Sequence, residues 1–134
     1  MIEANIKEPR LVIVDDDRAI SNLYAKVAKL QGFDVTTVTD GQMFLDHMSK
    51  HTVDAAILDL VMPQMDGFEV ISALKDMAKH PVLIISSGQK ISLLNGAERF
   101  AKDCGIDVFG LIQKPVDIVA LQAKIKAMYM QITT

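Results

Sequence analysis

Residues 11–17 read Leu11-Val12-Ile13-Val14-Asp15-Asp16-Asp17, a short run of branched apolar residues that ends in three acids. Two further apolar runs end in charged residues in a similar way, one at Asp59 and one just before Lys114. Short runs of this kind predict buried strands of a parallel sheet. In an open α/β sheet the functional crevice lies outside the carboxyl ends of the strands. The sequence therefore predicts one site that gathers several carboxylates and an ammonium group, which suits a divalent cation and a phosphoryl group.

Strand-like and helix-like segments alternate along the whole chain. We expect strands at about 10–14, 33–38, 53–58, 81–85 and 107–112, and helices at about 18–31, 40–50, 67–79, 90–104 and 117–130. This alternation predicts right-handed βαβ units, with helices covering both faces of the sheet. We therefore predict an α/β fold in which five helices surround a doubly wound, five-stranded parallel sheet of flavodoxin-like order 2-1-3-4-5.

Capping signals indicate where several of these helices begin and end. Asp17 directly precedes the first helix and is expected to be its N-cap, while Gly32 ends that helix. The stretches Thr39–Gln42 and Asp66–Glu69 both resemble capping boxes. Asp17 is therefore assigned to the helix rather than to the cation site.

The composition is typical of one globular domain. Of the 134 residues, half are hydrophobic and 23% are charged, and the net charge is −3. We predict a single domain over residues 1–134 with its core at about 9–131, and no direct contact with nucleic acid. No apolar run approaches the ~20 residues of a membrane span, the first eight residues are too polar for a signal peptide, and the single cysteine fits a cytoplasmic location.

Asp15 and Asp16 are candidate metal ligands. Adjacent carboxylates repel each other and stay ionised at low cost only near a cation, and Mg2+ prefers oxygen ligands. The alternative is that these acids simply cap the next helix. A third carboxylate, Asp59, ends another strand and favours the metal interpretation.

Asp59, Ser86 and Lys114 are candidates for phosphoryl chemistry. A carboxylate beside a cation can attack phosphorus and form an acyl phosphate. The Ser86 hydroxyl, at the end of the fourth strand, can donate a hydrogen bond to a phosphoryl oxygen. Lys114 can pair with a carboxylate or a phosphate as a point charge, and the following Pro115 allows a cis peptide bond. Taken singly, each residue also fits an ordinary turn or surface position.

In their order and spacing these motifs resemble the receiver domains of response regulators in two-component signalling, over about residues 9–131. The matching stretches are Val14–Asp17, Leu58–Gly67, Ser86–Gly88 and Lys114-Pro115. The resemblance implies that Asp59 accepts a phosphoryl group from a sensor histidine kinase or a phosphotransfer protein. It implies further that Asp16, Asp59 and the backbone carbonyl of Val61 bind Mg2+, with Asp15 helping through a water molecule, and that Ser86 and Lys114 contact the phosphoryl group.

The resemblance also implies a signalling role rather than metabolic catalysis. The domain would promote its own phosphorylation and dephosphorylation, and would act through the face made by the fourth helix, fifth strand and fifth helix. Its partner would be its own output domain or a downstream protein, and a homodimer is allowed. A finer resemblance to receivers fused to EAL-type cyclic-di-GMP phosphodiesterases would place an output domain beyond Thr134.

Two departures from the family pattern affect the expected behaviour. Leu111 occupies the position where the family usually has an aromatic residue that turns inward on activation. Val61 and Gly88 occupy positions that often carry polar side chains, which help the hydrolytic water. We therefore expect slow autodephosphorylation and a switching movement that differs from the usual one.

Two rival functions and one rival metal site follow from the same residues. In a haloacid-dehalogenase phosphatase, Asp15 would be the nucleophile and Asp17 the general acid, although Ala19 stands where a threonine is usual. A degenerate receiver would serve only as a docking module. His47 and His51 have a zinc-like spacing, but no third ligand is evident, and Cys104 is expected in the core.

Overall fold

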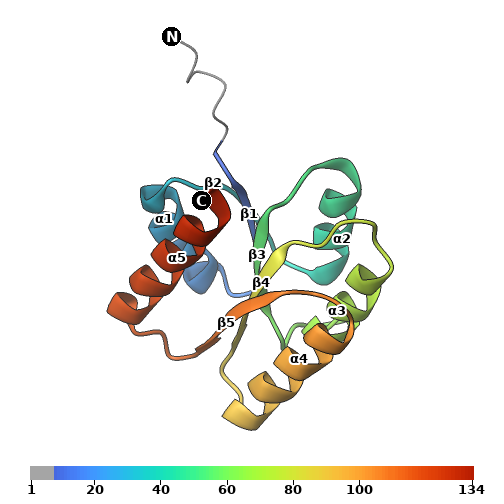
Figure 1. Ribbon diagram of the computed structural model, residues 1–134. Coiled ribbons are helices and arrows are strands. Elements are labelled where there is room, and N and C mark those ends of the chain that lie inside the picture. Colours follow the sequence, from blue (N-terminus) through green and yellow to red (C-terminus); the bar gives the residue numbers. More distant parts are fainter. Residues whose placement is uncertain (1–7) are drawn as a thin grey trace.

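A parallel sheet runs through the middle of the molecule, seen here in a computed structural model that describes residues 8–134 (Figure 1). Its strands are β1 (Arg10–Val14), β2 (Asp34–Val38), β3 (Ala55–Asp59), β4 (Val82–Ser87) and β5 (Val108–Gln113). They lie side by side in the order β2-β1-β3-β4-β5, and every neighbouring pair is parallel. The predicted fold class and strand order are confirmed. The prediction that the first residues are no signal peptide falls mostly on residues 1–7, which lie outside the described residues.

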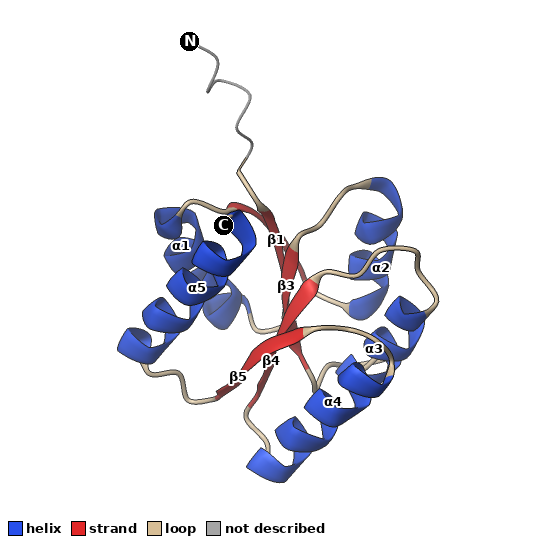
Figure 2. Cartoon of the chain, viewed as in Figure 1, coloured by secondary structure: helices blue, strands red, loops and turns tan. Residues whose placement is uncertain are grey.

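Helices cover both faces of the sheet. They are α1 (Arg18–Gln31), α2 (Gly41–Lys50), α3 (Gly67–Lys75), α4 (Ile91–Asp103) and α5 (Ile118–Thr133). Figure 2 shows α1 and α5 on one side of the sheet and α2, α3 and α4 on the other. This division gives the molecule a three-layer arrangement, as expected when right-handed crossovers connect parallel strands.

Two helix ends differ from the predicted ones. Helix α3 ends at Lys75 rather than near residue 79, because its last bonds tighten to a three-residue spacing and the chain must become extended before Pro81. Helix α5 continues to Thr133 rather than 130. No glycine or proline stops it there, and Ile132 packs against the core.

Two of the predicted helix N-caps are confirmed and one is wrong. Asp17 accepts hydrogen bonds from the N–H groups of the two residues Ala19 and Ile20, as predicted. The capping box of Asp66 and Glu69 is also confirmed. The capping box predicted at Thr39 is wrong, since Asp40 accepts the N–H of Met43 and the helix begins one residue later than that motif requires.

The core consists of two apolar layers, because successive side chains of a strand point to opposite faces of the sheet. The layer under α1 and α5 contains four isoleucines, one from each of four strands: Ile13, Ile57, Ile84 and Ile112. The other layer lies under α2, α3 and α4, and half-buried Cys104 packs against it. Two residues after each of these isoleucines comes a candidate site residue, in chain order Asp15, Asp59, Ser86 and Lys114. The strand period therefore carries all four to the α1/α5 face.

Candidate functional site

Three carboxylates meet where β1 and β3 end. One oxygen from each of Asp15, Asp16 and Asp59 lies within 4.8 Å of the other two, and residues 8–134 offer no other group of three potential metal ligands. Asp15 and Asp59 are buried, with 1% and 4% of their surface exposed, whereas Asp16 is exposed. A pocket with two buried acids and one open to solvent provides the oxygen donors and the open side that a partly hydrated divalent cation needs.

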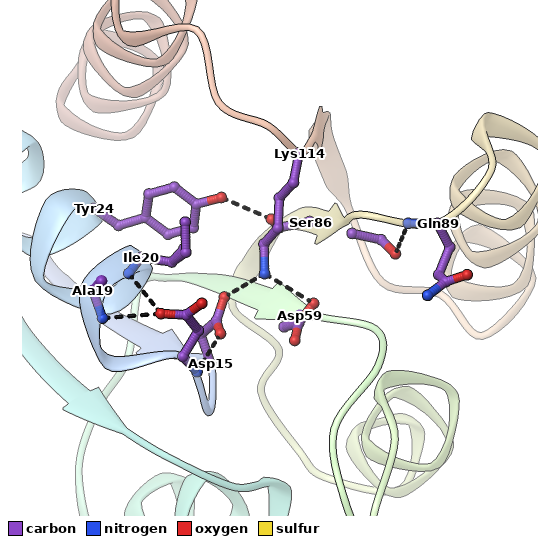
Figure 3. A network of polar contacts seen from close by, with 10 residues as sticks. Asp15, Ala19, Ile20, Tyr24, Asp59, Ser86, Gln89 and Lys114 are labelled. Atoms are coloured by element: carbon purple, nitrogen blue, oxygen red, sulfur yellow. Dashed lines mark hydrogen bonds and ion pairs between the residues drawn. The ribbon is translucent and has the colours of Figure 1, made fainter.

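Lys114 reaches into this acidic cluster from the end of β5 (Figure 3). Its Nζ lies 2.9 Å from Oδ2 of Asp15 and 3.5 Å from Oδ1 of Asp59. The Lys114 N–H donates to the carbonyl of Ser87, and the peptide bond to Pro115 is cis, as the sequence suggested. One ammonium group does not balance three carboxylates, so the pocket keeps an excess of negative charge that a cation would offset.

The environment of Asp59 changes its acidity. Burial, and after it the charge of Asp15, raise the pKa of this carboxyl group to about 6, even though Lys114 and the N–H of Val61 act in the opposite direction. Burial alone would lower the pKa of Lys114, but its hydrogen bond to Asp15 and the charge of Asp59 leave it raised. Lys114 is therefore a permanent cation beside Asp59, and a metal ion there would favour the ionised, nucleophilic carboxylate.

Ser86 is the neighbour of Asp59 across the β3–β4 pair. The two residues are Cα partners in register, and the N–H of Leu60 donates to the Ser86 carbonyl. The Ser86 side chain is fully buried, and its hydroxyl shares a hydrogen bond of 2.8 Å with the hydroxyl of Tyr24 on α1. The sequence alone did not indicate this partner, because a tyrosine on the core-facing side of a helix is typical of packing. The available signal was the hydroxyl itself, since a buried tyrosine usually needs a hydrogen-bond partner.

The remaining candidate residues lie around this centre or away from it. Val61 borders Asp59 with a half-exposed side chain, and Gly88 lies close to the side chain of Lys114. Leu111 faces the other way, into the layer under α4. His47 and His51 stack on each other, with ring centres 4.4 Å apart, and belong to no group of three metal ligands within residues 8–134.

A family model described as the response regulator receiver domain matches residues 11–126. The chain belongs to this family. The receiver domain is 30% identical to the transcriptional regulatory protein PrrA of Mycobacterium tuberculosis over 95% of this chain, and it covers 52% of that protein. It is 31% identical to the response regulator MprA of Mycolicibacterium vanbaalenii over 92% of this chain, again covering 52% of the relative. The chain thus spans about half the length of the curated relatives that it matches.

Solved receiver structures share the whole fold. A response regulator from Colwellia psychrerythraea superimposes with a TM-score of 0.81 and 30% identity, covering 93% of this chain and 99% of the other. A CheY-like receiver domain protein from Methanospirillum hungatei gives a TM-score of 0.79 at 25% identity, with 95% and 98% covered. The receiver function predicted from the motifs is confirmed at the level of the family, which sets aside the haloacid-dehalogenase alternative.

The position of Asp17 also argues against the haloacid-dehalogenase alternative, in which this residue would be the general acid. Its carboxylate caps α1 and is not a member of the acidic group, so it is not placed as a general acid beside Asp15.

None of the helices in residues 8–134 combines the length and the apolar character that crossing a membrane requires. Receiver domains are signalling modules, and the acidic pocket of this one suits a divalent cation and an aspartyl phosphate.

Proposed function

We propose that Asp59 is the phosphoacceptor of this receiver domain and takes its phosphoryl group from a sensor histidine kinase or a phosphotransfer protein. The observation that carries the proposal is the position of Asp59, buried between the ammonium of Lys114 and the carboxylates of Asp15 and Asp16. In the transfer, an oxygen of Asp59 forms a bond to phosphorus. The bond from phosphorus to the donor histidine nitrogen breaks, and that nitrogen keeps the electron pair.

The metal in this proposal is Mg2+, bound by Asp15, Asp16, Asp59 and the backbone carbonyl of Val61. The donor set fits, because it is made of oxygens only and carries more negative charge than Lys114 balances. When bound, the ion offsets the repulsion between the Asp59 carboxylate and the incoming phosphoryl oxygens.

Lys114 and Ser86 act on the phosphoryl group in this proposal. The Lys114 ammonium, which now lies nearer to Asp15, pairs with a phosphoryl oxygen, and the Ser86 hydroxyl donates to another. Both groups stabilise charge by position, which is how proteins promote phosphoryl transfer. We infer that the domain promotes its own phosphorylation and dephosphorylation in this way.

The signal is proposed to leave the site through the face formed by α4, β5 and α5. Its recipient is an output domain of the same protein or a downstream protein, in the cytoplasm, with a homodimer as one form of the active state. The named relatives PrrA and MprA are about twice as long as the part that matches, which supports the idea of a separate output region. The domain limits at about 9–131 and the junction to an EAL-type domain stay predictions.

Phosphorylation with acetyl phosphate and Mg2+, followed by intact-protein mass spectrometry, tests the proposal. We expect the wild type to gain the mass of one phosphoryl group and Asp59→Asn to gain none. Asp17→Asn is the matched control, because it makes the same chemical change at the helix cap, and it should be phosphorylated like the wild type. A phosphoryl group on Asp15 in the Asp59→Asn protein would contradict the assignment of Asp59 as the phosphoacceptor. A wild type that folds but takes up no phosphoryl group would favour the docking-module alternative.

A further inference from the structure

The hydrogen bond between Tyr24 and Ser86 joins α1 to the phosphorylation site (Figure 3). The two residues are 62 positions apart in the chain, and both side chains are fully buried. Tyr24 lies in the apolar layer under α1 and α5, among side chains such as Ile57 and Ile84. Within residues 8–134 its hydroxyl makes no hydrogen bond other than the one to Ser86. Burial raises the pKa of Tyr24, so its hydroxyl keeps its proton at neutral pH.

Ser86 therefore has two possible partners on the same face of the sheet. Its hydroxyl is now bonded to Tyr24 and makes no hydrogen bond to Asp59 or Lys114 among the described residues. Asp59 is its neighbour across the strand pair. A phosphoryl group on Asp59 would present charged oxygen acceptors, to which hydrogen bonds are stronger than to a neutral hydroxyl. A serine side chain can redirect its hydroxyl by moving to another staggered rotamer.

We propose that Tyr24 is a positioning residue that holds the Ser86 hydroxyl in the unphosphorylated state and competes with the phosphoryl group for it. This inference rests on the proposed function of Asp59. When the Ser86 Oγ moves to the rotamer that reaches the phosphoryl group, it leaves Tyr24, and the Tyr24 hydroxyl loses its partner inside an apolar layer. A buried hydroxyl without a partner is destabilising, so Tyr24 opposes the change.

The same bond offers a route for the signal. In this proposal, a shift of α1 or of its packing against α5 gives the released Tyr24 hydroxyl a new partner and so carries the signal. Leu111 lies in the opposite apolar layer and has no polar group to offer to Ser86. In this chain the hydroxyl of Ser86 is thus linked to α1, on the α1/α5 side of the sheet, rather than to an aromatic residue of β5.

Binding of beryllofluoride with Mg2+, a mimic of the phosphoryl group, tests the proposal on the full chain. We expect Tyr24→Phe to bind the mimic roughly tenfold more tightly than the wild type, which corresponds to about 1.4 kcal/mol. Tyr129→Phe is the matched control, since it removes the same atom from the other tyrosine. In a Ser86→Ala background, Tyr24→Phe should change the affinity no further, because the competition needs the Ser86 hydroxyl. A purely structural role of Tyr24 would alter the melting temperature without this dependence on Ser86.

The fluorescence of Tyr24 gives a second measurement, which does not require a variant at that position. The chain contains no tryptophan and two tyrosines, so Tyr129→Phe leaves Tyr24 as the only emitter of that kind. We expect its emission to change when beryllofluoride and Mg2+ bind. Should Tyr24→Phe fail to fold, this experiment decides the question, and an unchanged emission on binding would overturn the proposal.

The outcomes separate this inference from the proposed function. Equal or weaker binding by a folded Tyr24→Phe protein would overturn the inference, as would a tenfold gain that persists without the Ser86 hydroxyl. In both cases, binding of beryllofluoride and Mg2+ by the wild type would still support the proposed function of Asp59. A folded wild type that does not bind beryllofluoride with Mg2+ would overturn both.

Discussion

The ammonium of Lys114 lies 2.9 Å from the carboxylate of Asp15 and 3.5 Å from that of Asp59. The lysine is thus shared between an acid proposed to bind metal and the proposed phosphoacceptor, and it is nearer to the first. A cation bound by Asp15 would weaken the ion pair between Asp15 and Lys114. The ammonium would then be free to pair with a phosphoryl group on Asp59.

Replacing Lys114 by Gln should slow phosphorylation of Asp59 by acetyl phosphate about ten- to hundredfold, because hydrogen bonds to charged groups contribute about 1.5–3 kcal/mol. The rate is measured by mass spectrometry at saturating Mg2+. Lys102→Gln is the matched control, since Lys102 is exposed on α4 and pairs only with Glu98 among the described residues. A rate for Lys114→Gln equal to that of the control would remove Lys114 from the transfer step.

The raised pKa of Asp59, about 6, predicts a pH-dependent stability. A carboxyl group whose folded pKa lies above its unfolded value binds its proton more tightly in the folded state, so it destabilises the fold as pH rises from about 4 to 6. Asp59→Asn removes this effect. Above pH 6 the variant should be more stable than the wild type, by at most about 3 kcal/mol for a shift of two pKa units. The difference should shrink towards pH 4.

Urea denaturation at pH 4.5 and pH 7.5, without Mg2+, measures this difference. Asp17→Asn provides the comparison at an exposed position, although it also alters a helix cap. An Asp59→Asn protein whose advantage is the same at both pH values would show that the carboxyl group of Asp59 is not destabilising in its ionised form.

Mg2+ should stabilise the folded protein, because the acidic group of Asp15, Asp16 and Asp59 exists only in the folded state. At a concentration 100 times its Kd, the ion is expected to add about 2.7 kcal/mol to the free energy of unfolding. Thermal melting with and without a chelator measures the effect. Asp16→Asn should reduce it strongly even though Asp16 is exposed, whereas Asp46→Asn, on the exposed side of α2, should not. Equal stabilisation of both variants would place the ion elsewhere.

Dephosphorylation of Asp59 should be slow, because Val61 and Gly88 offer no polar side chain to orient a water molecule near the phosphoryl group. The Val61 side chain is 50% exposed and borders Asp59, so a polar replacement fits there. We expect Val61→Asn to accelerate loss of the phosphoryl group several-fold. Val119→Asn, which makes the same change at an exposed position of α5, is the control. A wild-type half-life of seconds, with Mg2+ and no phosphatase, would contradict the prediction.

The order of apolar runs along the chain specifies the sheet and the edge at which the acids meet. Apolar runs such as residues 11–14 specify buried strands, and alternation with helices restricts the order of the strands. Because parallel strands end at the same edge, Asp15 and Asp59 were expected together before any distance was known. Caps such as Asp17 were also predictable, since a cap depends on neighbours within a few residues.

The pairing of side chains within the site depends instead on how distant segments pack together. Asp15 and Asp16 are alike in the sequence, yet Asp15 is buried and Asp16 faces solvent. Lys114, 99 positions away in the chain, contacts Asp15 only because the folded sheet brings the two together. The bond between Tyr24 and Ser86 depends on how α1 packs over the sheet, which no local pattern specifies. Local signals act over a few residues, whereas this contact joins hydroxyl groups from segments that meet only when the core has formed.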